Sequence, residues 1–430
     1  MHNPNRNLFV GDENVIYIEN DSIRLGVNLD LGGAVTYLSE HGRKNLINSF
    51  DWGRQVQMSF YGHPVPFEPE GHKLSDHWKG LGWNPIQSGD FFGNRSRIVD
   101  HRQTEDEIYV KCVPMHWPLD NYPGECTFEV WYRLNGTRVD VTARLNNARP
   151  DTNKYPARPT ELPAVYTNGE WYKLVSYVGN KPFTGDTPTE LCTKENGLGW
   201  PWIGYRATEY WSALVDDANY GLGCYNDGST RYVGGFYGEK GSGGPKDAPT
   251  GYFCPEILEV LDHNIVYTYT YSLIVGELSH IRAEANELYR TSPRNFDRYE
   301  FSGTRDHFTY VNITDGGWPV GGCLDFDFPA DSALRSPAFF RKKGDLTRLV
   351  IDAEISGGEI PVTVTLSLYD SMGHARNYVY PKQDISCSIC GNGERQKHIL
   401  DLSALSEDSI DFAITFHAPG HAKVYSITME

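Results

Sequence analysis

The chain has 430 residues, and its 39 Lys and Arg against 56 Asp and Glu give a formal net charge of −17. This excess of negative charge argues against electrostatic binding to nucleic acid or to anionic lipid, and the length allows roughly two or three domains. Aromatic residues at 13% and 43 glycines describe a folded, loop-rich chain and favour β structure over disorder.

The sequence contains no apolar run of the ~20 residues that a membrane-spanning helix needs, and residues 1–7 lack the pattern of a signal peptide. We therefore expect a soluble chain without a membrane partner. Its location stays open, because a cytoplasmic protein and a secreted protein whose leader has been removed look the same in sequence.

The first part of the chain alternates apolar and polar residues in short runs, a pattern typical of strands buried on one side. Such runs occupy residues 15–18, 23–27, 107–110 and 128–134. Asn135-Gly136 follows the last run and precedes another, which predicts a hairpin because both residues accept positive φ. We expect an antiparallel, β-rich structure.

One segment, residues 278–290, has the pattern of a helix, with Ser279 as a candidate cap and Pro293 to end it. A long strand pattern precedes this helix and a polar connector follows it. The domain boundary is therefore expected near residues 291–300. This divides the chain into a larger domain over 1–290 and a smaller one over 300–430.

Short strand patterns separated by turn residues continue through the second domain. They predict a compact β-sandwich of roughly 130 residues. The runs are residues 324–328, 348–353, 362–368, 398–402, 411–416 and 424–427.

A dense mix of aromatic, polar and ionisable residues between positions 50 and 90 indicates long loops over a sheet face. A sugar site needs this mix, because aromatic rings stack on pyranose faces while amides, carboxylates and Arg pair with hydroxyls. The same aromatic residues would also serve to pin loops to the sheet. A later loop, Trp200-Pro201-Trp202, fits either a sugar subsite or a packed corner. The candidate substrate-binding residues are Arg54, Gln55, Gln57, His77, Trp83, Asn84, Gln87, Tyr166, Trp200 and Trp202.

Residues 14–290 resemble the galactose mutarotase-like β-supersandwich found in aldose epimerases and in many carbohydrate-active enzymes. The resemblance rests on the opening strands at 23–27 and 31–38 with their Gly32-Gly33 corner, and on Asn45-Leu46-Ile47-Asn48 leading into Gly53-Arg54. It implies an all-β fold, an antiparallel supersandwich followed by a smaller β-sandwich. The latter resembles a carbohydrate-binding module by its pattern.

The resemblance also implies a substrate-binding role for Arg54 and acid or base residues on the concave sheet. The His-Pro-Tyr-Phe type motif of true mutarotases is not found, and Pro163-Ala164-Val165-Tyr166 stands in the place of such a motif. The sequence therefore favours another reaction over epimerisation of a simple free sugar.

Single carboxylates lie beside apolar strand sequence at Glu161 and Glu209. Burial beside aromatic residues disfavours the charged form of a carboxyl, which raises its pKa toward the range useful for proton donation. A glycoside hydrolase needs two such groups, one as acid and one as base or nucleophile. We expect Glu161 and Glu209 to be this pair, with Asp90 in reserve, although each would also suit an exposed strand position or an Arg partner.

Histidine offers a second mechanism, since His116 and His77 can donate or accept protons near neutral pH. In a polysaccharide lyase a His or Tyr removes the C5 proton of a uronic acid while a basic or amide group neutralises its carboxylate. Arg54, Gln55 and Tyr166 would complete that set with the two histidines. The charge of −17 disfavours a polyanionic substrate, although a local basic groove would escape the whole-chain sum.

The sequence thus predicts an enzyme that cleaves a glycosidic linkage of an oligo- or polysaccharide, with a lyase as the runner-up. A non-catalytic glycan-binding protein and a sugar epimerase remain as further alternatives. The expected partner is the saccharide, with neither nucleic acid nor membrane, and the oligomeric state stays open.

No cofactor or catalytic metal is expected. Cys387 and Cys390 with His417 and His421 resemble zinc-ligand spacing, but the gap from the cysteines to the histidines is longer than in a finger. A local disulfide or two free thiols at Cys387 and Cys390 are expected instead. Asp325, Asp327 and Asp331 are candidate oxygen ligands for Ca²⁺ in a structural role.

Overall fold

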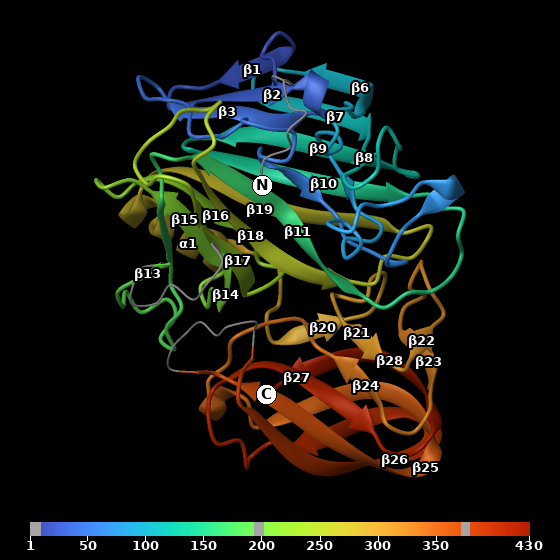
Figure 1. Cartoon of the computed structure of the whole chain (residues 1–430). Coiled ribbons are helices and arrows are strands. Elements are labelled where there is room, and N and C mark those ends of the chain that lie inside the picture. Colours follow the sequence, from blue (N-terminus) through green and yellow to red (C-terminus); the bar gives the residue numbers. More distant parts are fainter. Residues whose placement is uncertain (1–9, 193–201, 371–378) are drawn as a thin grey trace.

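The computed structural model describes residues 10–192, 202–370 and 379–430, and these are almost entirely strands and loops (Figure 1). The one α-helix of these residues is α1 (Leu278–Thr291). Three short 3₁₀ turns accompany it: η1 (Leu29–Leu31), η2 (Pro69–Gly71) and η3 (Lys343–Asp345). The all-β class predicted from the alternating runs is confirmed.

The chain opens with a three-stranded antiparallel sheet of β1 (Val15–Glu19), β2 (Ile23–Asn28) and β3 (Ala34–Glu40). The Gly-Gly corner noted in the sequence joins β2 to β3, with φ of 60° at Gly32 and 80° at Gly33. These left-handed conformations suit glycine, and a side chain at Gly33 would also meet Val110.

Two larger antiparallel sheets follow, and the first has nine strands. Within it the predicted hairpin is confirmed as β9 and β10, but Asn135 pairs with Arg138, so the connecting residues are Gly136 and Thr137. In spatial order its strands are β13 (Thr189–Leu191), β12 (Lys173–Ser176), β15 (Trp211–Val215), β16 (Tyr220–Tyr225), β19 (Val266–Glu277), β10 (Arg138–Asn147), β9 (Cys126–Asn135), β7 (Glu107–Val113) and β6 (Arg97–Gln103).

The second large sheet has seven strands and carries the site described below. Its inner face and the inner face of the nine-stranded sheet enclose one hydrophobic core, to which Leu162 and Phe253 contribute from one side and Phe128 and Tyr271 from the other. In spatial order its strands are β14 (Trp202–Arg206), β17 (Arg231–Tyr237), β18 (Thr250–Glu259), β11 (Arg158–Asn168), β4 (Gln57–Ser59), β5 (Pro85–Ile86) and β8 (Met115–His116).

The helix α1 packs on the nine-stranded sheet through Ile281 and Ala285, both fully buried. The helix was predicted one residue short, and its expected cap was wrong. The capping position is Glu277, which makes no side-chain cap bond, so Ser279 lies inside the first turn.

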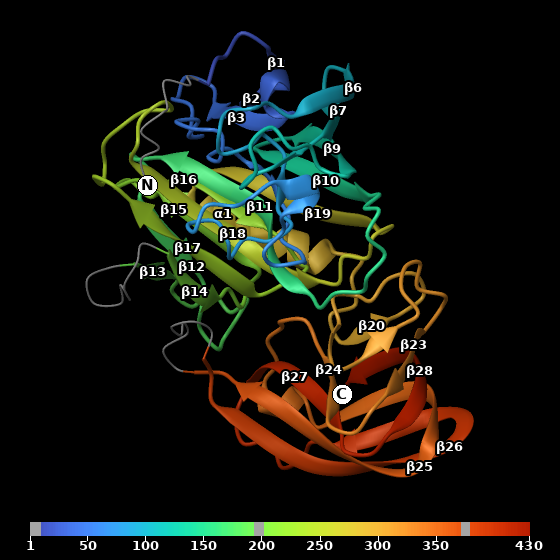
Figure 2. The ribbon, with the colours of Figure 1, turned by 45° about the vertical axis from the view of Figure 1, so that its right-hand side comes forward.

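All strands described after α1 belong to one sheet of nine. They are β20 (Arg298–Glu300), β21 (Thr309–Val311), β22 (Thr314–Asp315), β23 (Leu324–Phe328), β24 (Ser332–Arg335), β25 (Arg348–Leu368), β26 (Lys382–Asp401), β27 (Ser409–Phe416) and β28 (Gly420–Met429). The sheet curls around a single second core (Figures 1 and 2).

The long strand β25 explains how one sheet takes the place of two packed layers. Its first half pairs with β28 and its second half with β27, while β26 follows it along nearly its whole length. Gly357 and Gly358, both at positive φ, lie where the partner changes. The runs 348–353 and 362–368, predicted as two strands, are therefore parts of one bent strand.

The two hydrophobic cores lie on either side of α1 in the chain. The division into 1–290 and 300–430 itself stays a prediction. Arg206 on β14 pairs with Asp411 on β27 at 2.8 Å, so the two parts touch through charged groups. Within residues 10–192, 202–370 and 379–430, no helix has the length and apolar character to cross a membrane.

Candidate functional site

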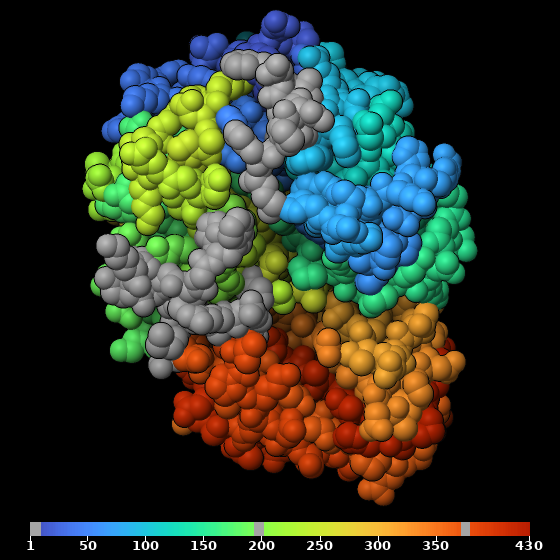
Figure 3. Space-filling model, in the orientation of Figure 1, coloured from blue at the N-terminus to red at the C-terminus, as the bar shows by residue number. Residues whose placement is uncertain are grey.

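A cleft of about 460 Å³ lies on the outer face of the seven-stranded sheet. Strands β4, β11, β17 and β18 form its floor, and loops from residues 51–54, 78–91 and 117 form its wall. In Figure 3 this face lies between the blue loops on one side and the yellow-green segment on the other. The volume lies in the range of small-molecule sites.

Glu161 on β11 is the central ionisable group of the cleft. Tyr252 donates a hydrogen bond to its Oε1 at 2.7 Å, and the hydroxyls of Ser59 and Tyr61 also bond its carboxyl. Burial nevertheless raises the pKa of Glu161 from an ordinary 4.5 to about 7, because desolvation outweighs these three bonds. At neutral pH a large share of Glu161 therefore carries a proton.

A β-bulge brings Glu161 to the same face as its neighbours in the cleft. The pairing of β11 with β18 shifts register between Glu161 and Val165, which inserts an extra residue into β11. Strict alternation would put residue 163 beside Glu161 on the cleft face. The shift lets Glu161, Ala164 and Tyr166 line the cleft together.

Glu256 on β18 supplies a second carboxylate to the cleft. It is the direct cross-strand partner of Glu161, so the two side chains leave the sheet from adjacent positions. Arg231 on β17 forms an ion pair with Glu256 at 2.8 Å. The negative charge of Glu256 in turn contributes to the raised pKa of Glu161.

Arg54 and Asp51 form a second charged group in the cleft. Arg54 Nε lies 3.4 Å from Asp51 Oδ2, and its Nη1 donates to the Ala248 carbonyl at 2.6 Å. Arg54 therefore ties the early loop to the segment before β18 while its side chain lines the cleft. This placement agrees with the binding role that the sequence implied for Arg54, which stays a proposal.

Aromatic rings border the cleft on two sides. Trp78, Phe91 and Trp117 pack edge to face on the loop side, with ring centroids 4.8 to 6.0 Å apart. On the sheet side, the ring centroid of Tyr252 lies 4.6 Å from that of Tyr166 and 4.9 Å from that of Trp202. Such rings offer flat apolar surfaces to the faces of a sugar.

Six residues predicted for the site lie together in the cleft. They are Arg54, Gln57, Asn84, Glu161, Tyr166 and Trp202. The amides of two of them are already bound within the protein. Gln57 donates to the Gly53 carbonyl at 3.0 Å, and Asn84 donates to the Phe60 carbonyl at 2.8 Å.

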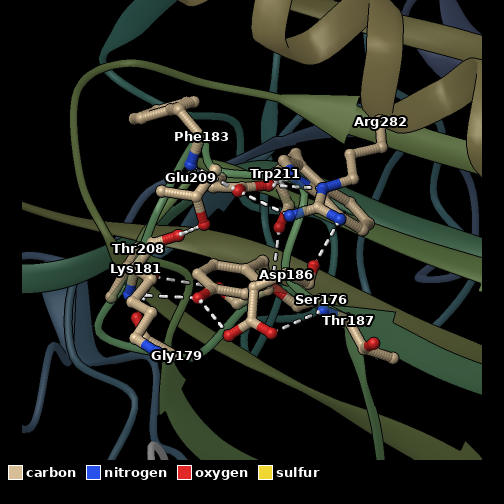
Figure 4. A network of polar contacts seen from close by, with 12 residues as sticks. Ser176, Gly179, Lys181, Phe183, Asp186, Thr187, Thr208, Glu209, Trp211 and Arg282 are labelled. Atoms are coloured by element: carbon tan, nitrogen blue, oxygen red, sulfur yellow. Dashed lines mark hydrogen bonds and ion pairs between the residues drawn. The ribbon is translucent and has the colours of Figure 1, made fainter.

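Glu209, expected as the catalytic partner of Glu161, does not line the cleft. Its carboxylate is fully buried and receives two hydrogen bonds from Arg282 of α1, at 2.8 and 2.9 Å (Figure 4). Trp211 Nε1 and the Phe183 amide donate to it as well. Glu209 therefore fixes the helix and a loop to the sheet, away from the cleft that Glu161 lines.

Asp90 and His116, the other two candidate catalytic residues, are also fully buried. Asp90 accepts hydrogen bonds from the amides of Phe92, Asn94 and Asn121, so it organises a loop. His116 accepts from the Asn84 amide through Nδ1 and bonds Glu125 through Nε2 at 3.0 Å. Both ring nitrogens are thus occupied, and His116 supports the cleft wall from behind.

The remaining predicted binding residues lie outside the cleft lining. Gln55 and Gln87 are buried, and their side chains form hydrogen bonds with the backbone. Trp83 is a core residue whose Nε1 donates a hydrogen bond to Glu125. His77 is exposed and packs on Trp78. Trp200 lies outside the described residues.

Sequence reasoning missed Glu256, Tyr61, Tyr252 and the loop residue Trp117. Glu256 stands beside apolar strand residues as Glu161 does, so the same criterion could have found it. The two tyrosines carry no local signal, because their role depends on which strands pair. Burial raises the pKa of both Tyr61 and Tyr252 well above the ordinary value, so both stay protonated donors.

In the described parts of the chain, no three His, Cys, Asp or Glu side chains are grouped to hold a metal ion. The proposed Ca²⁺ ligands Asp325 and Asp327 lie 3.4 and 2.9 Å from His421. Asp331 lies 3.0 Å from His417. Cys387 and Cys390 are free thiols and form no disulfide.

No family model and no curated protein matches the sequence. Among solved structures, a galactose mutarotase related enzyme from Lactobacillus acidophilus is 12% identical with a TM-score of 0.37, over 61% of this chain and 97% of its own. A galactose mutarotase-like protein from Lactobacillus casei is 11% identical with a TM-score of 0.38, over 61% and 99%. A 4-alpha-glucanotransferase from Thermococcus litoralis is 11% identical with a TM-score of 0.33, over 61% and 37%.

The chain thus matches galactose mutarotase-like structures over about 61% of its length, as the sequence resemblance predicted. At these scores and identities the likeness concerns the all-β fold alone. The function proposed below depends on the residues of this chain.

Proposed function

We propose that this chain hydrolyses a glycosidic linkage of an oligo- or polysaccharide, with Glu161 as the general acid. The observation that carries the proposal is a carboxyl with a pKa of about 7 next to an ion-paired carboxylate in an aromatic-lined cleft. A carboxyl with a raised pKa beside a second carboxylate is the arrangement that acid-catalysed glycoside cleavage uses.

In the proposed reaction, protonated Glu161 gives its proton to the glycosidic oxygen as the bond from that oxygen to the anomeric carbon breaks. The carboxylate of Glu256 lies next to the site of the positive charge that develops on the sugar and favours it electrostatically. Water then supplies a hydroxyl to the anomeric carbon and a proton that returns to the carboxyl pair. Arg231 is a positioning residue, because it acts through Glu256.

The geometry favours hydrolysis over the lyase alternative. A lyase needs a base for the C5 proton, and no histidine lines the cleft among the described residues. Tyr61, Tyr166 and Tyr252 lie there, but burial raises the pKa of each well above its ordinary value. A tyrosine that keeps its proton so firmly is a poor base near neutral pH.

A second candidate is proton exchange on a free sugar, as in an epimerase. The observation in its favour is that Tyr61 and Tyr252 both bond the Glu161 carboxyl, so hydroxyls and a titrating carboxyl meet at one point. Glu161 and a tyrosine hydroxyl could exchange protons with a sugar ring without cleaving a linkage. The products distinguish hydrolysis from epimerisation, because only hydrolysis creates new reducing ends.

The test is incubation with a panel of neutral and acidic polysaccharides, with reducing ends, unsaturated-product absorbance and anomer exchange measured together. We expect new reducing ends without absorbance, and a loss of about 100-fold or more in Glu161→Gln. Glu359→Gln, a change at an exposed strand position, is the matched control and keeps full activity. Anomer exchange alone, an absorbing product, saccharide binding without any product, or full activity in Glu161→Gln would each contradict the proposal.

A further inference from the structure

A second hollow, of about 500 Å³, lies between the seven-stranded sheet and the C-terminal sheet. We call it the interdomain groove. One wall comes from β14, β17 and β18, and the other from β21, β24, β25, β26 and β27. Its charged and hydroxyl-bearing lining residues include Arg206, Arg231, Arg335, Lys382, Thr365 and Ser367.

Basic side chains enter the groove from both walls. Arg206 and Arg231 are direct cross-strand partners, and like charges in such positions repel. Each arginine is accommodated by a carboxylate on a different element, since Arg206 pairs with Asp411 and Arg231 with Glu256, both at 2.8 Å. The sheet thus holds two guanidinium groups side by side at the edge of a hollow.

The opposite wall adds Arg335 on β24 and Lys382 on β26, both exposed. Neither forms an ion pair with a carboxylate of the described residues, whereas Arg206 and Arg231 each do. Asp331 and Asp411 are the acidic residues of the lining, and Asp411 is already paired with Arg206. Among the residues that line the groove, four Lys and Arg side chains stand against these two Asp, in a chain with a net charge of −17.

Hydroxyl groups lie in register with these cations. Arg335 pairs with Ala413, which pairs with Thr365, so Arg335 and Thr365 share one row across the sheet. The Thr365 hydroxyl donates a hydrogen bond to Asp384, the next residue of this row, at 2.7 Å and can still accept one. Ser367 is the direct partner of Lys382 in the next pair of strands. Cations interspersed with hydroxyls suit an anionic group on a sugar, because the same ligand presents charge and hydroxyls together.

The groove is joined to the cleft by one ion pair. Glu256 lines the cleft, its partner Arg231 lines the groove, and the next residues of β18, Ile257 and Leu258, continue into the groove. A saccharide chain lying along the outer face of β18 would therefore pass from the aromatic cleft to the basic groove.

We propose that the interdomain groove is an anion-binding subsite that takes a carboxylated or sulfated sugar unit next to the linkage held in the cleft. The assignment of the anion to the substrate rests on the proposed function, whereas the anion site depends only on the groove residues. The substrate class that follows is an acidic oligosaccharide with a ring stacked in the cleft and a charged group between Arg231, Arg335 and Lys382.

The test is calorimetric binding of three trimers at low salt: galactose, galacturonic acid and 6-sulfogalactose. All proteins carry Glu161→Gln, so that no ligand is consumed. The groove variant is Arg335→Ala with Lys382→Ala, both exposed positions whose loss should not disturb folding. The matched control, Arg97→Ala with Lys397→Ala, removes the same charge at exposed positions elsewhere.

We expect an acidic trimer to bind more tightly than the galactose trimer, and the groove variant to weaken that binding about tenfold or more. The control and the neutral trimer should show no change, and the tighter of the two acidic trimers identifies carboxylate or sulfate as the anion. Equal affinity of parent and groove variant for both acidic trimers, or no acidic binding at all, would overturn the proposal. Anion binding that depends on the groove in a protein without hydrolytic activity would keep the subsite and remove the proposed reaction.

Discussion

At the scale of single residues, the chemistry of the cleft depends on how burial and hydrogen bonding compete at Glu161. Desolvation raises its pKa, while the hydroxyls of Tyr252, Ser59 and Tyr61 lower it by stabilising the carboxylate. The resulting pKa of Glu161 is about 7, and a carboxyl with this pKa can both give and recover a proton near neutral pH.

If one of these hydrogen-bond donors is removed, the pKa of Glu161 is expected to rise. Tyr252→Phe deletes a bond to the carboxylate form, so the pKa of Glu161 should rise above 7. Because a general acid acts while protonated, the rate falls as pH rises through this pKa, and the alkaline limb of the rate profile should move to higher pH. Steady-state rates between pH 5 and 9 on the cleaved substrate measure the shift.

Tyr172→Phe, which removes a hydroxyl bonded to Asp217 away from the cleft, is the control and should leave the limb in place. An alkaline limb that stays still or moves to lower pH in Tyr252→Phe would show that Tyr252 does not stabilise the Glu161 carboxylate.

The sequence did not separate the carboxyl that lines the cleft from the one that is buried in an ion pair. Glu161 and Glu209 look alike in sequence, each a carboxyl beside apolar strand residues. What separates them is Arg282, which lies on a distant helix and binds Glu209. Partners so far apart in the chain are set by tertiary packing, which local patterns do not contain.

At the scale of elements, Glu209 and Arg282 fix α1 to the nine-stranded sheet. The pair is almost fully enclosed, since Glu209 is 0% and Arg282 13% exposed. Breaking an enclosed pair by removing one charge is costly, because the other charge stays buried without compensation.

Glu209→Gln should therefore lower the free energy of unfolding by about 3–5 kcal/mol. Denaturant unfolding measures the loss, and Glu209→Gln combined with Arg282→Met should lose less than the two single changes added together. Activity per folded molecule should stay unchanged. A stable variant with lost activity would restore Glu209 as a catalytic residue.

Elements made by local sequence were predicted well, and those made by distant pairing were not. The hairpin of β9 and β10 and the helix α1 follow from neighbouring residues. The pairing of β4 with β11, which builds the cleft floor, joins segments far apart in the chain. The long loops over a sheet face were predicted from their composition, and of their candidate residues Arg54 and Asn84 line the cleft whereas His77, Trp83 and Gln87 do not.

At the scale of the whole molecule, the two parts of the chain are linked by buried charge as well as by the groove. Arg305 is 1% exposed and pairs with Asp315 of its own part and with Asp262, which lies before β19, at 2.6 and 2.7 Å. These contacts join the C-terminal sheet to the rest of the chain, and the interdomain groove lies between the two.

Arg305→Ala should lower the free energy of unfolding by about 3–5 kcal/mol, because Asp262 and Asp315 would stay buried without their cation. Arg298→Ala removes a surface pair with Glu300 and should cost less than about 1 kcal/mol. Denaturant unfolding of both variants makes the comparison. Losses of equal size would mean that the enclosed Arg305 pairs stabilise the fold no more than a surface pair does.

The measurement that tests the central claim most directly is the titration of the Glu161 carboxyl by infrared difference spectroscopy, wild type minus Glu161→Gln. It needs no substrate and reports the protonation of one group. We predict a pKa of about 7, with the carboxylic acid band still present at neutral pH. A carboxyl that titrates near its ordinary 4.5 would be fully ionised at neutral pH and would contradict the role of Glu161 as the acid.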